Sequence, residues 1–168
     1  EFLAALPRRT DAGERIVVAH GSLDDPQEYT TEPEQAVAQL ARIAREQPSS
    51  RALVVGHTHR PWACNEAGLV LRPAPGGALD ISAAGRVLIN PGAIGQSRER
   101  GVRSRFAVLD LERETGDFHA VEYDVAGCRR ALEERGLPPG SYRLRRSALG
   151  GLRRIARGAR GVLRRVTS

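Results

Sequence analysis

Three of the four histidines in this 168-residue chain directly follow short apolar runs. His20 comes after the run at residues 16–19, and His57 and His59 follow the run at residues 52–55. Runs of this length, rich in leucine and valine, are typical of buried strands. Side chains at the carboxyl ends of strands in open α/β sheets line the usual crevice for ligands. Because imidazole is the commonest metal-binding side chain, these histidines indicate a metal site.

The number of histidines that follow strands decides between an ordinary imidazole at the edge of the core and a metal ligand. A single histidine after a strand is usually a capped or half-buried side chain, but three in two matched contexts favour metal ligation. His57 and His59 would share a face of an extended chain. In a tight turn, which Gly56 permits at the strand's end, they could instead diverge towards two neighbouring ions. His119 lies in an alternating stretch and is predicted to be an ordinary exposed strand residue.

Four motifs occur in order along the chain: His-Gly-Ser at residues 20–22, Gly-His-Thr-His-Arg-Pro at 56–61, a segment opening with Asn-Pro-Gly at 90–98, and Phe-Ala-Val-Leu-Asp at 106–110. Together they resemble the C-terminal half of a calcineurin-like metallophosphoesterase of the small bacterial phosphodiesterase type, over residues 10–137. The pair of Gly-His-Thr-His and Asn-Pro-Gly carries most of the specificity. The resemblance implies an α/β fold, the second half of a four-layer α/β/β/α sandwich with helices outside two packed sheets.

The resemblance also implies a hydrolase that uses two divalent ions (manganese, iron or zinc) to cleave phosphate mono- or diesters, including nucleotides. In such an enzyme, His20 and His57 would bind one ion and His59 the other. The resembling enzymes begin with Asp-x-His, Gly-Asp-x-x-Asp/Asn and Gly-Asn-His-Asp/Glu motifs, none of which occurs here. The bridging aspartate, the remaining ligands and the catalytic histidine that protonates the leaving group would lie upstream of Glu1. We therefore expect a fragment that is inactive alone.

The polar loop after the Asn-Pro-Gly motif supplies candidates for substrate binding. We assign Arg98 to a substrate phosphate, because a guanidinium can bind phosphate oxygens with two parallel hydrogen bonds. Arg103 and Arg105 flank the same loop, and a solvated surface arginine is the alternative for each. Resembling proteins have a proline where this chain has Ser97, which leaves the shape of the loop open. Asn90 is interpreted as a turn-forming residue rather than a reactive one.

The elements that must position the histidines form a predicted strand–helix–strand unit. Strands over residues 16–19 and 52–56 flank a helix over residues 34–46, with Thr31 as its cap and Pro33 in its first turn. Parallel strands joined by such a crossover open on one edge of the sheet, which would bring the histidine turns together. The helix face expected to pack on the sheet consists of Val37, Leu40, Ala41 and Ala44.

The rest of the chain is predicted to be rich in strands. We expect the last turn of a helix within residues 1–10, a turn at 11–14, strands over 62–65, 69–72 and 86–90, a loose loop over 73–84, a hairpin of residues 105–111 and 118–124 that turns at 114–117, and a helix over 126–135. The acidic residues Asp24, Asp25 and Glu28, in the loop after His20, are interpreted as solvated rather than as metal ligands.

Charge divides the chain into two parts. The net charge is +6, and every basic residue is an arginine. Residues 129–168 hold 12 arginines against two glutamates, or about +10. We assign residues 1–137 to the phosphoesterase-like domain and 138–168 to a basic extension, in which the apolar residues of 144–166 have near-helical spacing. This extension could contact an anionic membrane or nucleic acid, or form a flexible tail without a specific partner.

Composition sets the remaining expectations. No run approaches the length of a membrane span, the first residues lack a signal-peptide pattern, and Cys64 and Cys128 match no paired motif. We therefore expect two free thiols and a cytoplasmic protein, with peripheral membrane contact as the variant that the tail allows. Two other functions compete with hydrolysis. One is a non-catalytic scaffold recruited through the Arg-rich tail, and the other is a module that binds a single metal ion with His20, His57 and His59.

Overall fold

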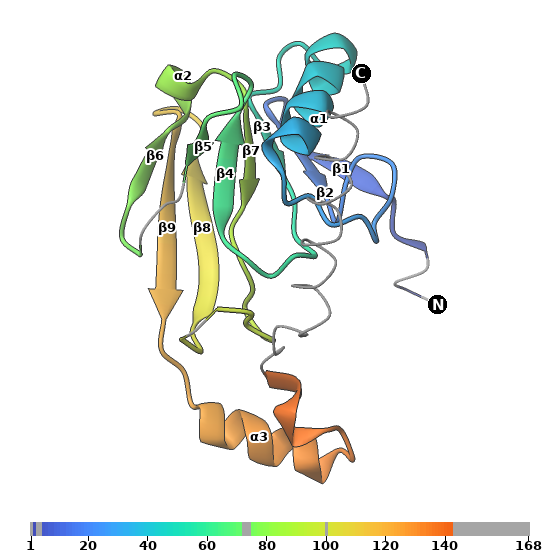
Figure 1. Cartoon of the computed structure of the whole chain (residues 1–168), viewed down its shortest axis with the longest axis vertical. Coiled ribbons are helices and arrows are strands. Elements are labelled where there is room, and N and C mark those ends of the chain that lie inside the picture. Colours follow the sequence, from blue (N-terminus) through green and yellow to red (C-terminus); the bar gives the residue numbers. More distant parts are fainter. Residues whose placement is uncertain (1, 3–4, 72–74, 100, 143–168) are drawn as a thin grey trace, which may run out of the picture.

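The computed structural model describes residues 2, 5–71, 75–99 and 101–142 as two β-sheets, the larger of which is covered by a helix (Figure 1). Sheet A has the strand order β1-β2-β3-β7-β4-β5, and sheet B has the order β6-β9-β8. The strands are β1 (Arg9–Ala12), β2 (Ile16–Ala19), β3 (Ala52–Val54), β4 (Trp62–Asn65), β5 (Val70–Leu71), β6 (Ala78–Asp80), β7 (Val87–Asn90), β8 (Ser104–Asp110) and β9 (Thr115–Val121). The helices are α1 (Pro33–Glu46), α2 (Ile81–Ala84) and α3 (Val125–Glu134), with a short 3-10 helix η2 (Pro139–Tyr142).

The predicted strand–helix–strand unit is confirmed. β2 and β3 pair in parallel, with Ile16 opposite Ala52 and Val18 opposite Val54, and α1 makes the crossover between them. β7 pairs in parallel with the other side of β3. The carboxyl ends of these three strands therefore meet at one edge of sheet A, where the histidine turns and the Asn-Pro-Gly motif begin.

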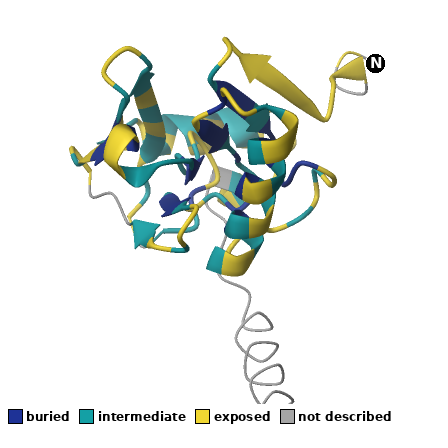
Figure 2. Cartoon of the chain, turned by 90° about the horizontal axis from the view of Figure 1, so that it is seen from above, coloured by how far each residue is buried: buried dark blue, intermediate teal, exposed yellow. Residues whose placement is uncertain are grey.

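Two clusters of buried side chains hold the layers together. One lies between α1 and sheet A, and the other lies between sheet A and sheet B. Figure 2 shows the buried segments gathered in the interior, with the outer side of α1 exposed. The first cluster includes Val17, Ala36, Leu40, Ile43, Leu53, Val55 and Leu88, and the second includes Ile16, Ala52, Leu79, Ile81, Val87, Ile89 and Phe118. Burying such apolar surface stabilises a fold by roughly 25 cal/mol per Å².

The buried face of α1 differs from the predicted one. The helix buries Ala36, Leu40 and Ile43, whereas Ala41, which we placed on the packed face, is exposed. Ile43 explains the difference. It lies three residues after Leu40, on the same side of the helix, and burying its side chain removes more apolar area from water than burying Ala41 would.

The first turn of α1 is capped by a residue other than the one we predicted. The Gln35 side-chain oxygen accepts hydrogen bonds from the backbone N–H groups of Thr31, at 3.0 Å, and Glu32, at 3.1 Å. Glu32 occupies the N-cap position, and Pro33 is the first helical residue as expected. The prediction of Thr31 as the cap is therefore wrong by one residue.

Two short strands lie where none was predicted. β1 occupies the boundary between the expected helix end and turn, and pairs antiparallel with β2 although all four of its residues are exposed (Figure 2). β6 and the short α2 lie in the expected loop over residues 73–84, where Leu79 is buried opposite Gly116 of β9. Neither strand has an alternating apolar pattern in its sequence. Each is a strand through backbone pairing with its neighbour, which the sequence pattern does not record.

The hairpin of β8 and β9 turns earlier than its sequence suggests. The turn lies at residues 111–114, whereas Glu114–Asp117 carried the expected turn residues. Gly116 instead lies inside β9, where a Cβ atom would be only 3.0 Å from Leu109 Cδ2. A glycine in a strand interior often marks such a close approach rather than a turn.

The described residues form three of the expected layers: α1, sheet A and sheet B. α3 lies beyond the end of β9 and buries none of its own residues (Figure 1). The outer face of sheet B leaves Val108 53% and Val121 48% exposed, and a helical layer over it stays a prediction. The stretch 144–166 of the basic extension lies outside the described residues. Within the described part of the chain, no helix combines the length and the apolar character needed to cross a membrane.

Candidate functional site

Two of the three strand-end histidines meet, and the third turns away. His57 Nδ1 lies 3.3 Å from His20 Nε2, with the ring centroids 5.1 Å apart. His59 instead directs its Nδ1 at the backbone oxygen of Gln96, 3.0 Å away. Of the two geometries left open by the sequence, the histidines therefore diverge. In the described part of the chain, no three histidine, cysteine or acidic side chains converge as a metal site. The single-ion module built from all three histidines stays a prediction.

The divergence comes from an unusual backbone. His57 and His59 both have φ 56°, in the left-handed region that non-glycine residues rarely adopt. We expected Gly56 to provide the sharp bend, but its φ is not in this region. Each such residue costs on the order of 1–3 kcal/mol and persists only where the surroundings enforce it. The turn therefore needs a firm support.

Asn90, at the end of β7, provides that support. Its side chain is fully buried, and its Nδ2 donates to the Gly56 oxygen, at 2.6 Å, and to Thr58 Oγ1, at 2.9 Å. Its Oδ1 accepts a hydrogen bond from the Gly92 N–H at 3.0 Å. Thr58, which lies between the two histidines, is itself buried. Asn90 is thus a turn-forming residue, as predicted, and it joins the Asn-Pro-Gly turn to the histidine turn.

The histidine nitrogens have a geometry that suits metal ions. Two ligands of one tetrahedral ion at 2.0–2.1 Å are about 3.3 Å apart. His57 Nδ1 and His20 Nε2 have this spacing, 3.3 Å, and are within hydrogen-bond distance of each other when no ion lies between them. At His59, the Nδ1–H donates to the Gln96 carbonyl, which leaves the Nε2 lone pair available. A backbone carbonyl on the second ring nitrogen is the usual way in which proteins orient a metal-binding imidazole. The three side chains therefore fit a pair of ligands plus a separately oriented one.

Electrostatics keep His57 in the form that binds metals. Partial burial lowers the pKa of His57 below its ordinary value, and the nearby charges of His20, Arg98 and His59 lower it further. A backbone hydrogen bond with Gln27 opposes these effects only in part. The neutral imidazole, which alone has a free lone pair, is therefore favoured at neutral pH.

Tyr29 and Arg98 form a wall beside the histidine pair. The Tyr29 ring packs on the His57 ring, with centroids 4.3 Å apart. The Arg98 guanidinium lies 5.2 Å from the Tyr29 ring centroid and donates a hydrogen bond from Nη2 to the Tyr29 hydroxyl at 3.0 Å. The structure thus brings Arg98 to the cluster, next to an aromatic residue of the loop after His20, which the sequence analysis did not single out. Its one sequence signal was an aromatic side chain among polar neighbours.

The loop that carries Arg98 is tied down at several points. The buried Ser97 hydroxyl donates to the Gly101 oxygen at 3.2 Å and accepts from the Glu99 N–H at 3.2 Å. The Glu99 carboxylate binds the half-buried Arg105 guanidinium through two hydrogen bonds of 2.7 Å each. Arg103 pairs with Glu122 at 3.2 Å. Of the three arginines considered as substrate-binding residues, only Arg98 contacts Tyr29 beside the histidine pair.

The acidic residues of the preceding loop serve structural roles. Asp24 pairs with Arg42 of α1, and the Asp25 carboxylate accepts the Gln27 N–H at 2.8 Å. The Glu28 carboxylate accepts a hydrogen bond from Gln35 at 3.2 Å. Each of these three carboxylates has a protein partner, and the expectation that none of them is a metal ligand stays a prediction.

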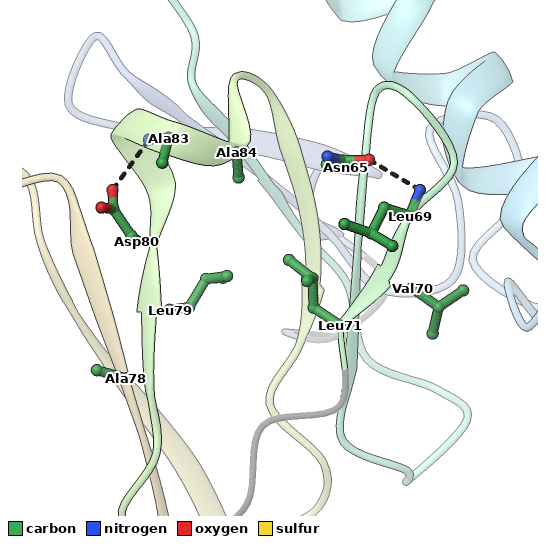
Figure 3. A pocket seen from close by; sticks show the side chains of 9 residues that line it. All are labelled: Asn65, Leu69, Val70, Leu71, Ala78, Leu79, Asp80, Ala83 and Ala84. Atoms are coloured by element: carbon green, nitrogen blue, oxygen red, sulfur yellow. Dashed lines mark hydrogen bonds between the residues drawn. The ribbon is translucent and has the colours of Figure 1, made fainter.

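An apolar cleft of about 520 Å³ opens at the other end of sheet A, between β5 and β6 (Figure 3). Its polar lining residues already cap local backbone: Asp80 accepts from the Ala83 N–H at 2.9 Å, and Asn65 accepts from the Leu69 N–H at 2.8 Å. Asn65 pairs with Val87, the first residue of β7, whereas the histidine turns lie beside Asn90, the last residue of that strand. The cleft therefore takes no part in the histidine site.

Comparisons with known proteins identify a family and a fold. The model of the calcineurin-like phosphoesterase superfamily domain matches residues 4–114. A metallophosphoesterase from Sphaerobacter thermophilus superposes with a TM-score of 0.67 and 33% identity, over 84% of this chain and 59% of that one. The hypothetical protein PH1004 from Pyrococcus horikoshii shares the fold, with a TM-score of 0.54 and 22% identity over 84% of this chain and 50% of its own. The uncharacterized protein MJ0912 of Methanocaldococcus jannaschii is 28% identical over 86 residues, which are 51% of this chain and 35% of that protein.

Proposed function

The chain belongs to the calcineurin-like phosphoesterase superfamily, and we propose that its histidine cluster is part of a two-metal centre that hydrolyses phosphate mono- or diesters. Phosphoester hydrolysis is the general activity of the family. The observation that carries the proposal is the arrangement of His20, His57 and His59: one pair of nitrogens 3.3 Å apart, and a third imidazole held by a backbone carbonyl. This arrangement supports one ion that His20 and His57 share and a second, separate ion at His59.

The three histidines and Arg98 each have a role in this proposal. His20 and His57 hold one divalent ion, and His59 holds the other. When bound, two such ions acidify a water molecule and neutralise phosphoryl oxygens. Arg98 binds a phosphoryl oxygen of the substrate from the wall beside His57, where its charge complements that of the ester. Manganese, iron and zinc all accept imidazole ligands, so the donor set does not select one of them.

The remaining parts of the centre are expected outside this chain. The chain spans 59% of the Sphaerobacter protein and 35% of the archaeal relative. The resemblance assigns the bridging carboxylate, the other metal ligands and the catalytic acid to motifs that precede the region matched here. We therefore propose that the chain alone binds metal weakly and does not turn over substrate. Binding of the basic extension to a membrane or to nucleic acid, and a cytoplasmic location, likewise remain proposals.

The test is phosphodiesterase activity on the chain extended upstream to its natural start. With manganese and a chromogenic phosphodiester, turnover should be lost in the His57→Ala, His59→Ala double variant. His119→Ala is the matched control, because His119 lies on β9 and stacks on Phe106 instead of facing the cluster. A folded extended protein with no bound metal and no turnover would contradict the proposal and favour a non-catalytic scaffold.

A further inference from the structure

Tyr29 connects two groups that the proposed reaction needs. On one side its ring packs on His57, with centroids 4.3 Å apart. On the other it holds Arg98 twice, through a 3.0 Å hydrogen bond to its hydroxyl and through the guanidinium 5.2 Å from the ring centroid. Tyr29 is 44% exposed, so these contacts form at the open surface of the site rather than within the core. The sequence places Tyr29 and Arg98 69 residues apart.

Arg98 differs from its neighbours in having no acidic partner among the described residues. Arg105 is neutralised by Glu99 at 2.7 Å, and Arg103 by Glu122 at 3.2 Å. Arg98 donates one hydrogen bond to a neutral phenol. A guanidinium carries five N–H donors in a planar fork, so most of the donors of Arg98, and its full charge, remain for a ligand. A phenol can thus fix the orientation of the guanidinium without cancelling its charge.

We propose that Tyr29 is a positioning residue that holds Arg98 beside the histidine pair, ready to bind a phosphoryl group. This inference rests on the proposed function and adds to it the residue that sets the geometry of the phosphate-binding arm. Arginine side chains lose substantial rotamer freedom when they bind a ligand. An arginine already held against a ring has lost part of that freedom before the phosphate arrives, which increases affinity. Tyr29 therefore acts through Arg98 and need not touch the substrate itself.

The first test is binding of inorganic phosphate to the metal-loaded, full-length protein, measured by calorimetry. Tyr29→Phe removes the hydroxyl but keeps the ring that packs on His57. One neutral hydrogen bond corresponds to a loss of affinity of about two- to twelve-fold. The same factor should appear in KM and in the inhibition constant of phosphate, with kcat little changed, because Arg98 would hold the phosphoryl group throughout the reaction. Arg103→Gln, from the same loop, is the matched control and should leave phosphate affinity unchanged.

The second test asks whether Tyr29 acts through Arg98. In an Arg98→Gln background, Tyr29→Phe should change phosphate affinity by less than about two-fold, because the partner that it positions is gone. Equal losses in both backgrounds would show that Tyr29 acts independently and would overturn the inference. A matched thermal midpoint for Tyr29→Phe and the unmodified protein excludes a folding defect as the cause.

The two levels of the proposal can fail separately. If Arg98→Gln weakens phosphate binding but Tyr29→Phe does not, the positioning role is wrong while Arg98 keeps its proposed role. If neither variant changes phosphate binding in a protein that still binds metal, the assignment of Arg98 fails too. If the full-length protein binds no metal, the proposed function itself fails.

Discussion

Replacing Asn90 tests the link between the core and the histidine turn. Asn90→Ala removes both side-chain donors and the acceptor that connect Gly56, Thr58 and Gly92. The backbone of β7 is unchanged by this substitution, because Asn90 also pairs with Trp62 of β4 through the main chain. The turn loses the side chain that supports its two left-handed residues.

The cost follows from burial. Each buried polar group left without a partner costs about 1–3 kcal/mol. Thr58 is buried, whereas Gly56 and Gly92 are half-buried, so water can partly replace the lost bonds there. We therefore expect Asn90→Ala to lower the free energy of unfolding by about 2–4 kcal/mol. The histidine nitrogens should also lose their fixed spacing, which we expect to weaken cobalt binding by roughly ten-fold or more, equivalent to about 1.4 kcal/mol.

Asn65→Ala is the matched control. Asn65, the last residue of β4, likewise holds nearby backbone with its side chain, accepting hydrogen bonds at 3.2 and 2.8 Å, but it lies at the other end of sheet A. Its loss should cost about 1 kcal/mol and leave cobalt binding unchanged. Urea unfolding of residues 1–168 gives the stabilities, and cobalt absorption titrations of the full-length protein give the affinities. If the two variants agree within about 0.5 kcal/mol in stability and bind cobalt equally, Asn90 does not support the site.

Three further outcomes follow from burial. Burial raises the pKa of the Cys64 thiol, and its side chain is enclosed, so a thiol reagent at pH 8 should label Cys128 first and Cys64 only on unfolding; equal labelling rates would contradict this. A Cβ atom at Gly21 would lie 2.6–2.7 Å from three backbone carbonyl oxygens, so Gly21→Ala should cost about 1–3 kcal/mol in urea unfolding, whereas Gly95→Ala, which meets nothing within 4 Å, should be neutral. Phe118→Ala should cost about 3–5 kcal/mol, because the ring lies 1% exposed between the two sheets; a loss below 1 kcal/mol would refute that packing.

The sequence predicts the strands next to the histidines well. The apolar runs before His20 and His57 are long enough and sufficiently β-branched to identify β2 and β3, and the crossover helix dictates that they run in parallel. The meeting of His20 with His57 follows from that topology. The free state of both cysteines is also as predicted.

Other features depend on tertiary contacts that local patterns do not record. β1 is exposed along its whole length and β6 has a single buried residue, so neither shows alternation. The turn with left-handed backbone at His57 and His59 is hydrogen-bonded to Asn90, more than 30 residues away in the chain. The position of Tyr29 against His57 depends on a loop whose path is set by contacts with α1, and composition alone described it as solvated.

The most direct test of the central claim is a count of metal ions per chain in single histidine variants of the full-length protein, by elemental analysis. The arrangement of one shared ion and one separate ion predicts that each single variant, His20→Ala, His57→Ala or His59→Ala, keeps one ion per chain. The double variant His20→Ala, His57→Ala should also keep one, the double variant His57→Ala, His59→Ala should keep none, and His119→Ala should keep both. If the two double variants kept the same number of ions, or if no cluster variant lost any, the two-metal assignment of His20, His57 and His59 would be wrong.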